Sequence, residues 1–396
     1  MKATHMSAFP KLPAAGLAAC LSLASSFCVS AEQPANPAVK KAMQGFIDSR
    51  EIAGAVTVVA DREKMLHFDA AGSADIEANK PMCEDSIFWI ASMTKPITAT
   101  AVMMMQEEEK LSVDDPVSKY LPEFKELKDA AGHEVSITIK QCLTHSSGLQ
   151  DVPNDEARGV KTLAEFTPLV VAKPLKFAPD SKWEYCQSGI NTVARVVEVV
   201  SGKSFPEFLN ERLFTPLGMK DTSFYPTEAQ IARIANSYKR TGDGKLEKAE
   251  ITFLGGKSIS DKDRYPRANG GLFSTAADYT RFAQMILRGG ELDGKRYLKP
   301  ESVKQMTSVQ SGDLITGFTP GNAWGLGWCL IREPQGISAA LSSGTFGHGG
   351  LFGTQVWIDP VKERIYLLLI QRANFENQGG SDGSDIRRDF QNAAAQ

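Results

Sequence analysis

The sequence predicts an α+β fold in which both ends of the chain form one antiparallel sheet and the middle forms a mainly helical lobe. Two hairpin patterns support this. Near the start, strand-forming residues at 55–60 and 66–70 flank a polar turn. Near the end, apolar runs at 353–358 and 364–370 flank a second turn. Since the residues between them have mainly helical spacing, the economical arrangement places both hairpins in a single sheet.

Four segments have the apolar periodicity of amphipathic helices. The first, 37–49, precedes the first hairpin. The other three lie in the middle of the chain at 190–200, 205–214 and 275–287. The helices over 190–200 and 275–287 are each followed by glycine, a residue that commonly ends helices. The middle of the chain is therefore expected to be helical.

Composition and charge indicate an ordinary globular protein. The chain has 396 residues, of which 42% are hydrophobic and 23% charged, and its net charge is only -3. No basic cluster interleaved with aromatic residues is present, so nucleic acid is not an expected partner. This length allows one or two domains; we expect a single domain over 32–396, with a sheet lobe from about 32–90 and 320–375 and a helical lobe from about 91–319. After the leader, no run of about eighteen apolar residues predicts a membrane span.

Residues 1–31 have the pattern of a signal peptide. Lys2 and Lys11 supply the positive start, an apolar stretch covers 14–29, and small residues follow at its end. The protein is therefore expected to be exported, either periplasmic or secreted. The alternative is a lipoprotein acylated at Cys20, but the apolar stretch continues beyond that cysteine and argues against it.

The remaining cysteines predict neither a disulfide framework nor a metal site. Four lie after the leader: Cys83, Cys142, Cys186 and Cys329. They are far apart in a chain large enough to fold without cross-links, so buried free thiols are the default expectation. No Cys-x-x-Cys or His-Glu-x-x-His pattern occurs, and His133 and His145 are isolated. No metal or other cofactor is expected.

Ser92 and Lys95 are the first candidate pair for chemistry. A short apolar run at 86–90 precedes them and helix-forming residues follow, so Ser92 is expected at the N-terminus of a helix. Positions three apart share a helix face, which lets the amine take the proton of the hydroxyl. Backbone N–H groups at this helix start suit an oxyanion. The alternative is a capping serine beside a solvated lysine.

Tyr185 is expected on a turn that leads into the helix near Ile190. A phenol has a pKa of about 10 and a lysine about 10.4, so either needs a shift of about 3 units to act as a base near neutrality. A protonated Lys95 favours the phenolate, whereas a buried Lys95 favours the neutral amine. The sequence does not decide whether Lys95 or Tyr185 acts as the base. The alternative is a tyrosine that only packs in a turn.

A third candidate motif, His348-Gly349-Gly350-Leu351, precedes the last hairpin. Glycines there let another backbone or a substrate approach closely and leave N–H groups directed into a cleft. The alternative is a glycine-rich turn with a satisfied histidine.

Three other glycine-containing stretches are assigned to structure. The segments 270–275 and 143–149, the second with His145, are typical of turns and helix caps. The segment 379–383 matches the Gly-x-Ser-x-Gly elbow, but no strand precedes it and no histidine follows it. The polar tail over 374–384 is expected to be mobile and without chemistry.

The order Ser92-Met93-Thr94-Lys95, Tyr185-Cys186-Gln187 and His348-Gly349-Gly350 resembles the serine β-lactamase and penicillin-recognising superfamily, in particular its class C β-lactamase-like branch with its esterases and D-amino-acid peptidases. Further stretches at 143–149 and 324–328 are also similar to that branch, and the resemblance covers nearly all of the mature chain. It implies a β-lactamase-like fold with the catalytic helix between the two lobes.

The resemblance implies a catalytic role for each motif. Ser92 is expected to be acylated by the substrate carbonyl, while Lys95 and Tyr185 share proton transfer. The N–H groups of Ser92 and Leu351, the latter just after an edge strand, are expected to form the oxyanion hole. Substrate contacts are expected from a second set of residues: Gln187, His348, Gly349, Gly350 and Leu351.

Two departures from the branch bear on the substrate. Gln187 stands where asparagine is usual, and His348 stands where lysine is usual. An imidazole with a pKa near about 6.5 is mostly neutral at pH 7 and recognises the carboxylate of a β-lactam poorly. The leading expectation is therefore a carboxylic ester hydrolase of small molecules. The alternatives are a β-lactamase, a D-amino-acid peptidase or DD-carboxypeptidase, and a catalytically silent protein that binds cell-wall peptide.

Overall fold

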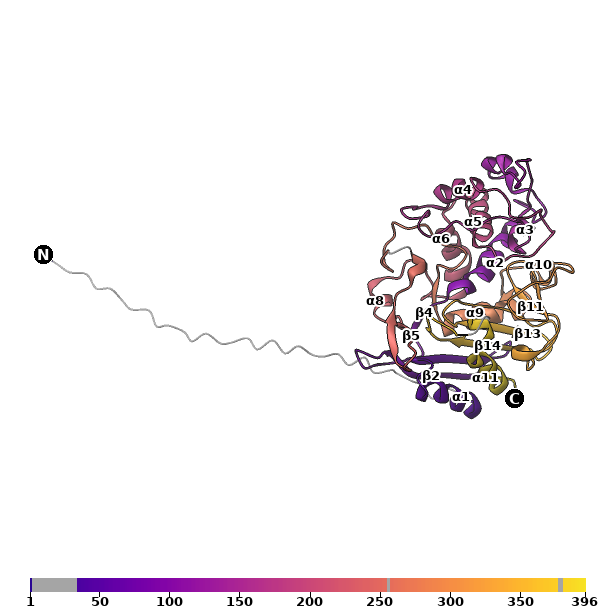
Figure 1. The fold of residues 1–396 in the computed structure, drawn as a ribbon. Helices are drawn as coiled ribbons and strands as arrows, with labels where there is room; N and C mark the ends of the chain where they lie inside the picture. Colours follow the sequence, from indigo (N-terminus) through magenta and orange to yellow (C-terminus); the bar gives the residue numbers. More distant parts are fainter. Residues whose placement is uncertain (2–33, 255–256, 377–379) are drawn as a thin grey trace.

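A computed structural model describes residues 1, 34–254, 257–376 and 380–396 (Figure 1). The expected signal peptide and Cys20 lie outside the described residues, apart from Met1. An eight-stranded antiparallel sheet with the order β10-β11-β12-β13-β14-β1-β2-β3 forms one lobe. Its strands are β1 (Gly54–Ala60), β2 (Met65–Asp75), β3 (Lys80–Pro81), β10 (Asn322–Trp324), β11 (Cys329–Ile331), β12 (Phe346–Gly349), β13 (Gln355–Asp359) and β14 (Arg364–Leu369). The predicted α+β class is confirmed.

The two predicted hairpins are neighbours in this sheet. Strand β1 of the first hairpin pairs antiparallel with β14 of the second, with Val58 opposite Leu367. Both strands are almost entirely buried and rich in Val, Leu and Ile, as expected of strands covered on both faces. The sheet is thus assembled from both ends of the chain, as predicted.

Helices cover both faces of the sheet. On the outer face α1 (Pro37–Asp48) and α11 (Asp385–Ala394) lie side by side (Figure 1). They bury Met43 and Phe390 in one core cluster with Trp357 and Tyr366 of the sheet. On the inner face α9 (Ala276–Leu287) packs against β1 and β14. The helix α1 follows its prediction, with Asn36 as its cap.

Most of the remaining helices form the second lobe. They are α2 (Thr94–Glu107), α3 (Ile139–Leu143), α4 (Leu163–Val171), α5 (Gln187–Ser201), α6 (Phe205–Leu209), α7 (Thr215–Leu217) and α8 (Glu228–Ile231). The helix α10 (Pro300–Met306) lies beside the sheet lobe instead (Figure 1). Apart from its last two residues α2 is buried on all sides, as a helix in the middle of a large protein should be. The predicted helices at 190–200 and 275–287 are α5 and α9. The third, at 205–214, is α6 followed by a π-helical turn over Asn210–Phe214.

Three short two-stranded sheets complete the structure. They pair β4 (Ile87–Trp89) with β7 (Phe273–Thr275), β5 (Ser237–Arg240) with β6 (Leu246–Ala249), and β8 (Glu291–Leu292) with β9 (Lys295–Arg296). The first of these matters for function, because β4 is the predicted extended run that leads directly to Ser92.

Three of the four cysteines after the leader follow the default expectation. Cys142, Cys186 and Cys329 are buried free thiols. Cys83 is only half-buried, so the expectation of a buried side chain is wrong there. No helix within the described ranges has the length and apolar character needed to span a membrane.

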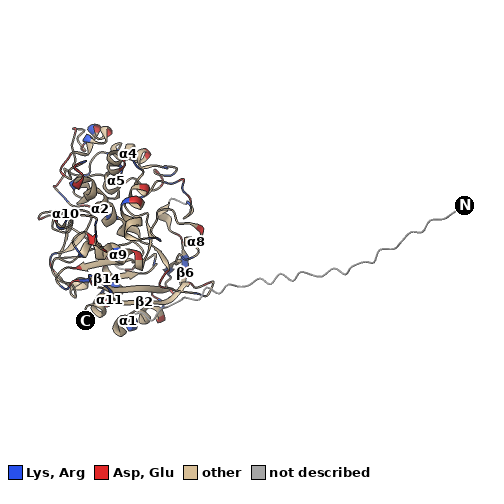
Figure 2. Cartoon of the chain, turned by 180° about the vertical axis from the view of Figure 1, so that it is seen from behind, with Lys and Arg blue, Asp and Glu red and all other residues tan. Residues whose placement is uncertain are grey.

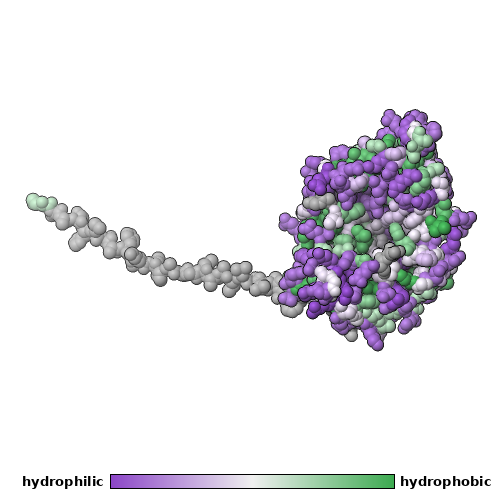
Figure 3. All heavy atoms as spheres, in the orientation of Figure 1, coloured by the Kyte–Doolittle hydropathy of each residue, from purple (hydrophilic) through white to green (hydrophobic). Residues whose placement is uncertain are grey.

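The surface is mixed in character. Acidic and basic residues are interspersed over both lobes (Figure 2). Apolar and weakly polar residues gather in the middle of the face seen in Figure 3, between more hydrophilic regions above and below.

Candidate active site

Ser92 lies where β4 gives way to α2. The chain makes one 3-10 turn over Ala91–Met93 before α2 begins at Thr94. Ala91 has φ +46°, a left-handed conformation that costs a non-glycine residue about 1–2 kcal/mol. The turn leaves Ser92 half-buried and in the lining of a cavity. The predicted position at the start of a helix is confirmed.

Lys95 is fully buried directly behind Ser92. Its Nζ lies 3.0 Å from Ser92 Oγ, 2.8 Å from Gln187 Oε1 and 2.7 Å from the Asn269 carbonyl oxygen. A neutral amine keeps two N–H donors for Gln187 and Asn269 and directs its lone pair at the serine hydroxyl. Burial lowers the Lys95 pKa to about 7, although the charge of Asp151 opposes that change. The amine is therefore substantially neutral near pH 7.

Tyr185 lies against the same amine. Lys95 Nζ is 4.5 Å from the centre of the Tyr185 ring, and the Tyr185 hydroxyl is 3.5 Å from His348 Nε2. Burial raises the Tyr185 pKa well above 10, and a hydrogen bond with Ser92 only partly opposes this rise. A phenolate is thus disfavoured while a neutral amine is favoured. Of the two bases that the sequence left open, electrostatics favour Lys95.

His348 is a neutral imidazole at the end of β12. Its Nδ1 lies 2.7 Å from the Gly349 carbonyl oxygen, so Nδ1–H donates there and Nε2 faces Tyr185. Burial, together with the nearby charge of Lys95, lowers the His348 pKa to about 3. This agrees with the expectation that position 348 carries no positive charge at neutral pH.

Strand β12 is not the predicted edge strand, because it lies between β11 and β13. However, β11 pairs only with Phe346 and Gly347, so His348 and Gly349 extend beyond it and line the cavity. The strands β10 and β11 that displace β12 from the edge have three residues each, too short for a periodic signal in the sequence.

The glycine at 350 is required by packing. A Cβ there would lie 2.1 Å from Thr354 Oγ1 and 2.7 Å from the Ile90 carbonyl oxygen, just before the Ser92 turn. Leu351 follows with 60% of its surface exposed, and its N–H has no hydrogen bond to another described residue. The close approach brings the 348–351 segment beside Ser92, as the motif predicts.

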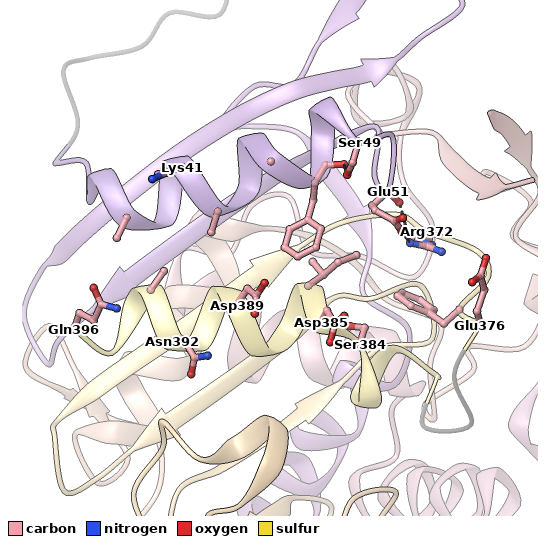
Figure 4. Close-up of a pocket in the computed structure, with 17 residues that line it drawn as sticks. Lys41, Ser49, Glu51, Arg372, Glu376, Ser384, Asp385, Asp389, Asn392 and Gln396 are labelled. Atoms are coloured by element: carbon pink, nitrogen blue, oxygen red, sulfur yellow. Dashed lines mark hydrogen bonds and ion pairs between the residues drawn. The ribbon is translucent and has the colours of Figure 1, made fainter. Parts of the chain in front are cut away.

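The cavity gathers nearly all of the predicted site residues. Its volume is about 360 Å³. Predicted residues in its lining are Ser92, Tyr185, Gln187, His348, Gly349, Gly350 and Leu351. Aromatic side chains of Trp89, Phe253 and Phe318 add apolar wall. A larger groove of about 980 Å³ lies between α1 and α11 on the outer face (Figure 4), and none of the predicted site residues lines it.

Two residues that the sequence did not assign to the site support it. Asn269 orients Gln187, since its Nδ2 donates to Gln187 Oε1 at 2.8 Å. Asp151 Oδ1 accepts the N–H of Gln187 at 2.6 Å and of Ser188 at 3.0 Å, and so caps α5. The sequence could not identify either residue, because Asn269 and Asp151 both act on the start of α5, which lies far from them in the chain.

His145 occupies a turn, as predicted, but it also positions Tyr185. Its φ is +62°. Its Nδ1 accepts the Cys186 N–H at 3.2 Å, its carbonyl oxygen accepts the Glu184 N–H at 3.0 Å, and its ring lies 4.5 Å from that of Tyr185. The ring nitrogen and the main-chain carbonyl of His145 therefore hold the residues on the two sides of Tyr185.

The tail after the second hairpin is not without a role. Gly380, Ser381 and Asp382 return to the cavity and form part of its lining. The prediction of a tail without visible chemistry is therefore wrong for these residues. The segment does not form a nucleophile elbow, because it is a short 3-10 turn over Gly380–Gly383 followed by α11.

Comparisons with known proteins agree with this geometry. The Beta-lactamase family model matches residues 39–388. Penicillin-binding protein 4 of Amycolatopsis lactamdurans is 33% identical, covering 73% of this chain and 72% of its own. Esterase EstB of Burkholderia gladioli is 29% identical, covering 84% and 88%. The solved structure of EstCE1, a hydrolase with promiscuous acyltransferase activity, superposes with a TM-score of 0.77 at 26% identity, covering 91% and 98%. The chain belongs to the Beta-lactamase family.

Proposed function

We propose that this protein is a serine hydrolase that cleaves carboxylic esters through an acyl-enzyme on Ser92. The observation that carries the proposal is the 3.0 Å contact between Ser92 Oγ and the buried amine of Lys95. Lys95 Nζ takes the hydroxyl proton while Oγ forms a bond to the substrate carbonyl carbon. The N–H groups of Ser92 and Leu351 face the resulting oxyanion.

The remaining steps return the site to its starting state. As the bond from carbon to the leaving oxygen breaks, a proton passes from the Lys95 ammonium to that oxygen by way of the Tyr185 hydroxyl, which lies beside Lys95 and Ser92. Water then attacks the acyl-enzyme and gives its proton to Lys95. The bond between the acyl carbon and Ser92 Oγ then breaks as the Lys95 ammonium returns the proton to Oγ, which releases the carboxylic acid and restores the Ser92 hydroxyl and the neutral amine.

The lining favours an ester over a β-lactam. No lysine or arginine is among the described residues that line the cavity, and His348 is neutral, so a substrate carboxylate has no cation to meet. Trp89, Phe253 and Phe318 offer apolar surface to an acyl or aryl group. The similarity to EstB, named an esterase, and to EstCE1, named a hydrolase with acyltransferase activity, also supports an ester as the substrate. β-Lactam or D-amino-acid peptide hydrolysis is second, supported by the family and the penicillin-binding relative.

Substrate preference can be tested directly. With a para-nitrophenyl butyrate and a chromogenic cephalosporin at equal concentrations, we expect turnover of the ester to exceed that of the cephalosporin by at least about a hundredfold in kcat/KM, a difference of about 2.7 kcal/mol. Turnover of the cephalosporin without turnover of the ester would reverse the order of the two candidates.

Activity is expected to rise with pH through the Lys95 pKa of about 7. Protonated Lys95 cannot accept the Ser92 proton, so kcat/KM should fall about tenfold per pH unit well below that value and level off above it. Tyr185 and His348 should add no further inflection to the pH profile of kcat/KM, since their pKa values are shifted away from neutrality. The check is kcat/KM for an aryl ester from about pH 5 to 9.

A variant that removes a charge near Lys95 tests whether the midpoint of the pH profile belongs to this residue. The Asp151 carboxylate raises the Lys95 pKa, so Asp151→Asn should move the midpoint to lower pH while the amide still caps α5. Lys119→Glu, on the surface of the helical lobe, serves as a control that should leave the midpoint in place. A profile that is flat across this range would exclude Lys95 as the base.

We also propose that the protein is exported with residues 1–31 as a signal peptide. The support is the sequence pattern alone: a basic start, an apolar stretch and small residues at the end. The intact mass of the exported protein separates this from a lipoprotein acylated at Cys20, because acylation adds the mass of lipid and leaves Cys20 as the first residue.

A further inference from the structure

The segment Gly380–Asp382 packs against the glycine strand of the site. Ser381 Oγ donates to the Gly350 carbonyl oxygen at 3.0 Å. A Cβ on Gly349 would lie 2.4 Å from Asp382 Oδ1, so the absence of a side chain at 349 makes room for this carboxylate. Asp382 therefore lies beside the strand that faces Ser92 across the cavity.

A buried arginine fixes Asp382 in this position. Arg387 of α11 has a side chain only 1% exposed, and its Nη1 lies 2.8 Å from the Asp382 carbonyl oxygen and 3.2 Å from its Oδ1. Its guanidinium is 4.4 Å from the centre of the Trp357 ring, which holds it inside the sheet lobe. The Asp382 side chain is 22% exposed. The pair thus presents its negative end to the cavity and keeps its positive end behind the wall.

The charge of the lining follows from this arrangement. Asp382 is the one acidic residue among the described residues that line the cavity, and none of them is a lysine or arginine. A single carboxylate in a partly enclosed cavity repels an anionic group and attracts a cationic one at short range.

We propose that Asp382 determines the charge of the substrate that this site accepts. It rejects esters with a carboxylate near the scissile bond and favours esters whose alcohol or phenol part is neutral or carries an amine or quaternary ammonium group. The inference rests on the proposed ester hydrolysis and adds the substrate class to it. Asp382 acts as a specificity residue, and the nucleophile and base stay as described.

The test uses three phenyl butyrates that differ only in a meta substituent: hydrogen, carboxylate or trimethylammonium. Burial raises the pKa of the Asp382 carboxyl while the charge of Arg387 opposes that rise, so the rates are measured at about pH 8, on the alkaline side of neutrality. We expect kcat/KM of the wild type to be at least about tenfold higher for the cationic than for the anionic ester after division by their alkaline hydrolysis rates. In Asp382→Asn this ratio should shrink by about tenfold.

Two further variants test whether a change in preference is due to the charge of Asp382 itself. Asp382→Asn leaves Arg387 buried without its partner, so the double variant Asp382→Asn, Arg387→Met removes both charges and should show the same loss of preference if the single variant fails to fold. Asp389→Asn is the matched control. It removes one carboxylate from α11 that pairs with Arg388 at the surface and does not line the cavity, so the preference should persist.

Failure of this inference can be told apart from failure of the proposed function. Inhibition by phenylboronate and by meta-carboxyphenylboronate measures the charge preference of the same cavity and does not require ester turnover. Weaker binding of the carboxylate form to the wild type, relieved in Asp382→Asn, supports the role of Asp382 even if no ester is cleaved. Ester turnover and boronate binding with the same charge preference in wild type and Asp382→Asn would overturn the role of Asp382 and leave ester hydrolysis standing.

Discussion

Replacing Ser92 with alanine is expected to abolish ester hydrolysis, with kcat reduced by at least about 10⁴-fold. The substitution removes the oxygen that forms the acyl-enzyme, and neither Lys95 nor Tyr185 is a nucleophile of comparable strength in its surroundings. The fold should persist, because Ser92 is half-buried and alanine suits the start of a helix. The measurement is steady-state turnover of an aryl ester together with the thermal unfolding midpoint.

A matched serine substitution shows whether the loss is specific. Ser343 lies on an exposed loop, where its Oγ donates to the Arg332 carbonyl oxygen. Ser343→Ala should keep turnover close to that of the wild type. Appreciable turnover by Ser92→Ala, above the level of protein purified from an empty expression host, would rule out Ser92 as the nucleophile.

Replacing Lys95 with methionine is expected to lower kcat/KM by about 10³–10⁴-fold. Methionine has a similar length and suits a fully buried position, but it has no lone pair to take the Ser92 proton. The Gln187 amide oxygen loses a donor and keeps that of Asn269, so the cost in unfolding free energy should be about 1–3 kcal/mol. Kinetics and chemical denaturation measured together separate the two effects.

Comparison with Tyr185→Phe tests whether the two residues act as one unit. Lys95 and Tyr185 are in direct contact and share the same proton path. The double variant should therefore lose far less than the product of the two single losses. Losses that simply multiply would mean that the residues act independently. Lys119→Met removes a surface amine and should leave kcat/KM unchanged.

Much of the fold could be predicted because its signals are local. The strands β1, β2, β13 and β14 alternate or form apolar runs of five or more residues, and their turns are polar. The sheet lobe also contains elements that sequence reasoning missed. The strands β10 and β11 are too short to show a period, so the sequence wrongly predicts β12 at the edge of the sheet. The helix α11 was missed because it follows a polar tail.

The site could be predicted where spacing alone determines geometry. Ser92 and Lys95 are one helical turn apart, and their contact follows from that spacing. The choice between Lys95 and Tyr185 as base depended on burial, which the sequence does not reveal. The contributions of Asn269, His145 and Asp382 depend on contacts between segments far apart in the chain. Side chains of this kind carry no local pattern that distinguishes them from ordinary turn residues.

The most direct test of the account is mass spectrometry of the protein after treatment with a fluorophosphonate, which reacts with serines activated by a base. We expect one adduct in the wild type, located on the peptide that contains Ser92, and a strongly reduced yield in Lys95→Met at the same exposure. An unmodified wild-type protein would favour a catalytically silent binder of cell-wall peptide. An adduct on a different serine would contradict the assignment of the nucleophile.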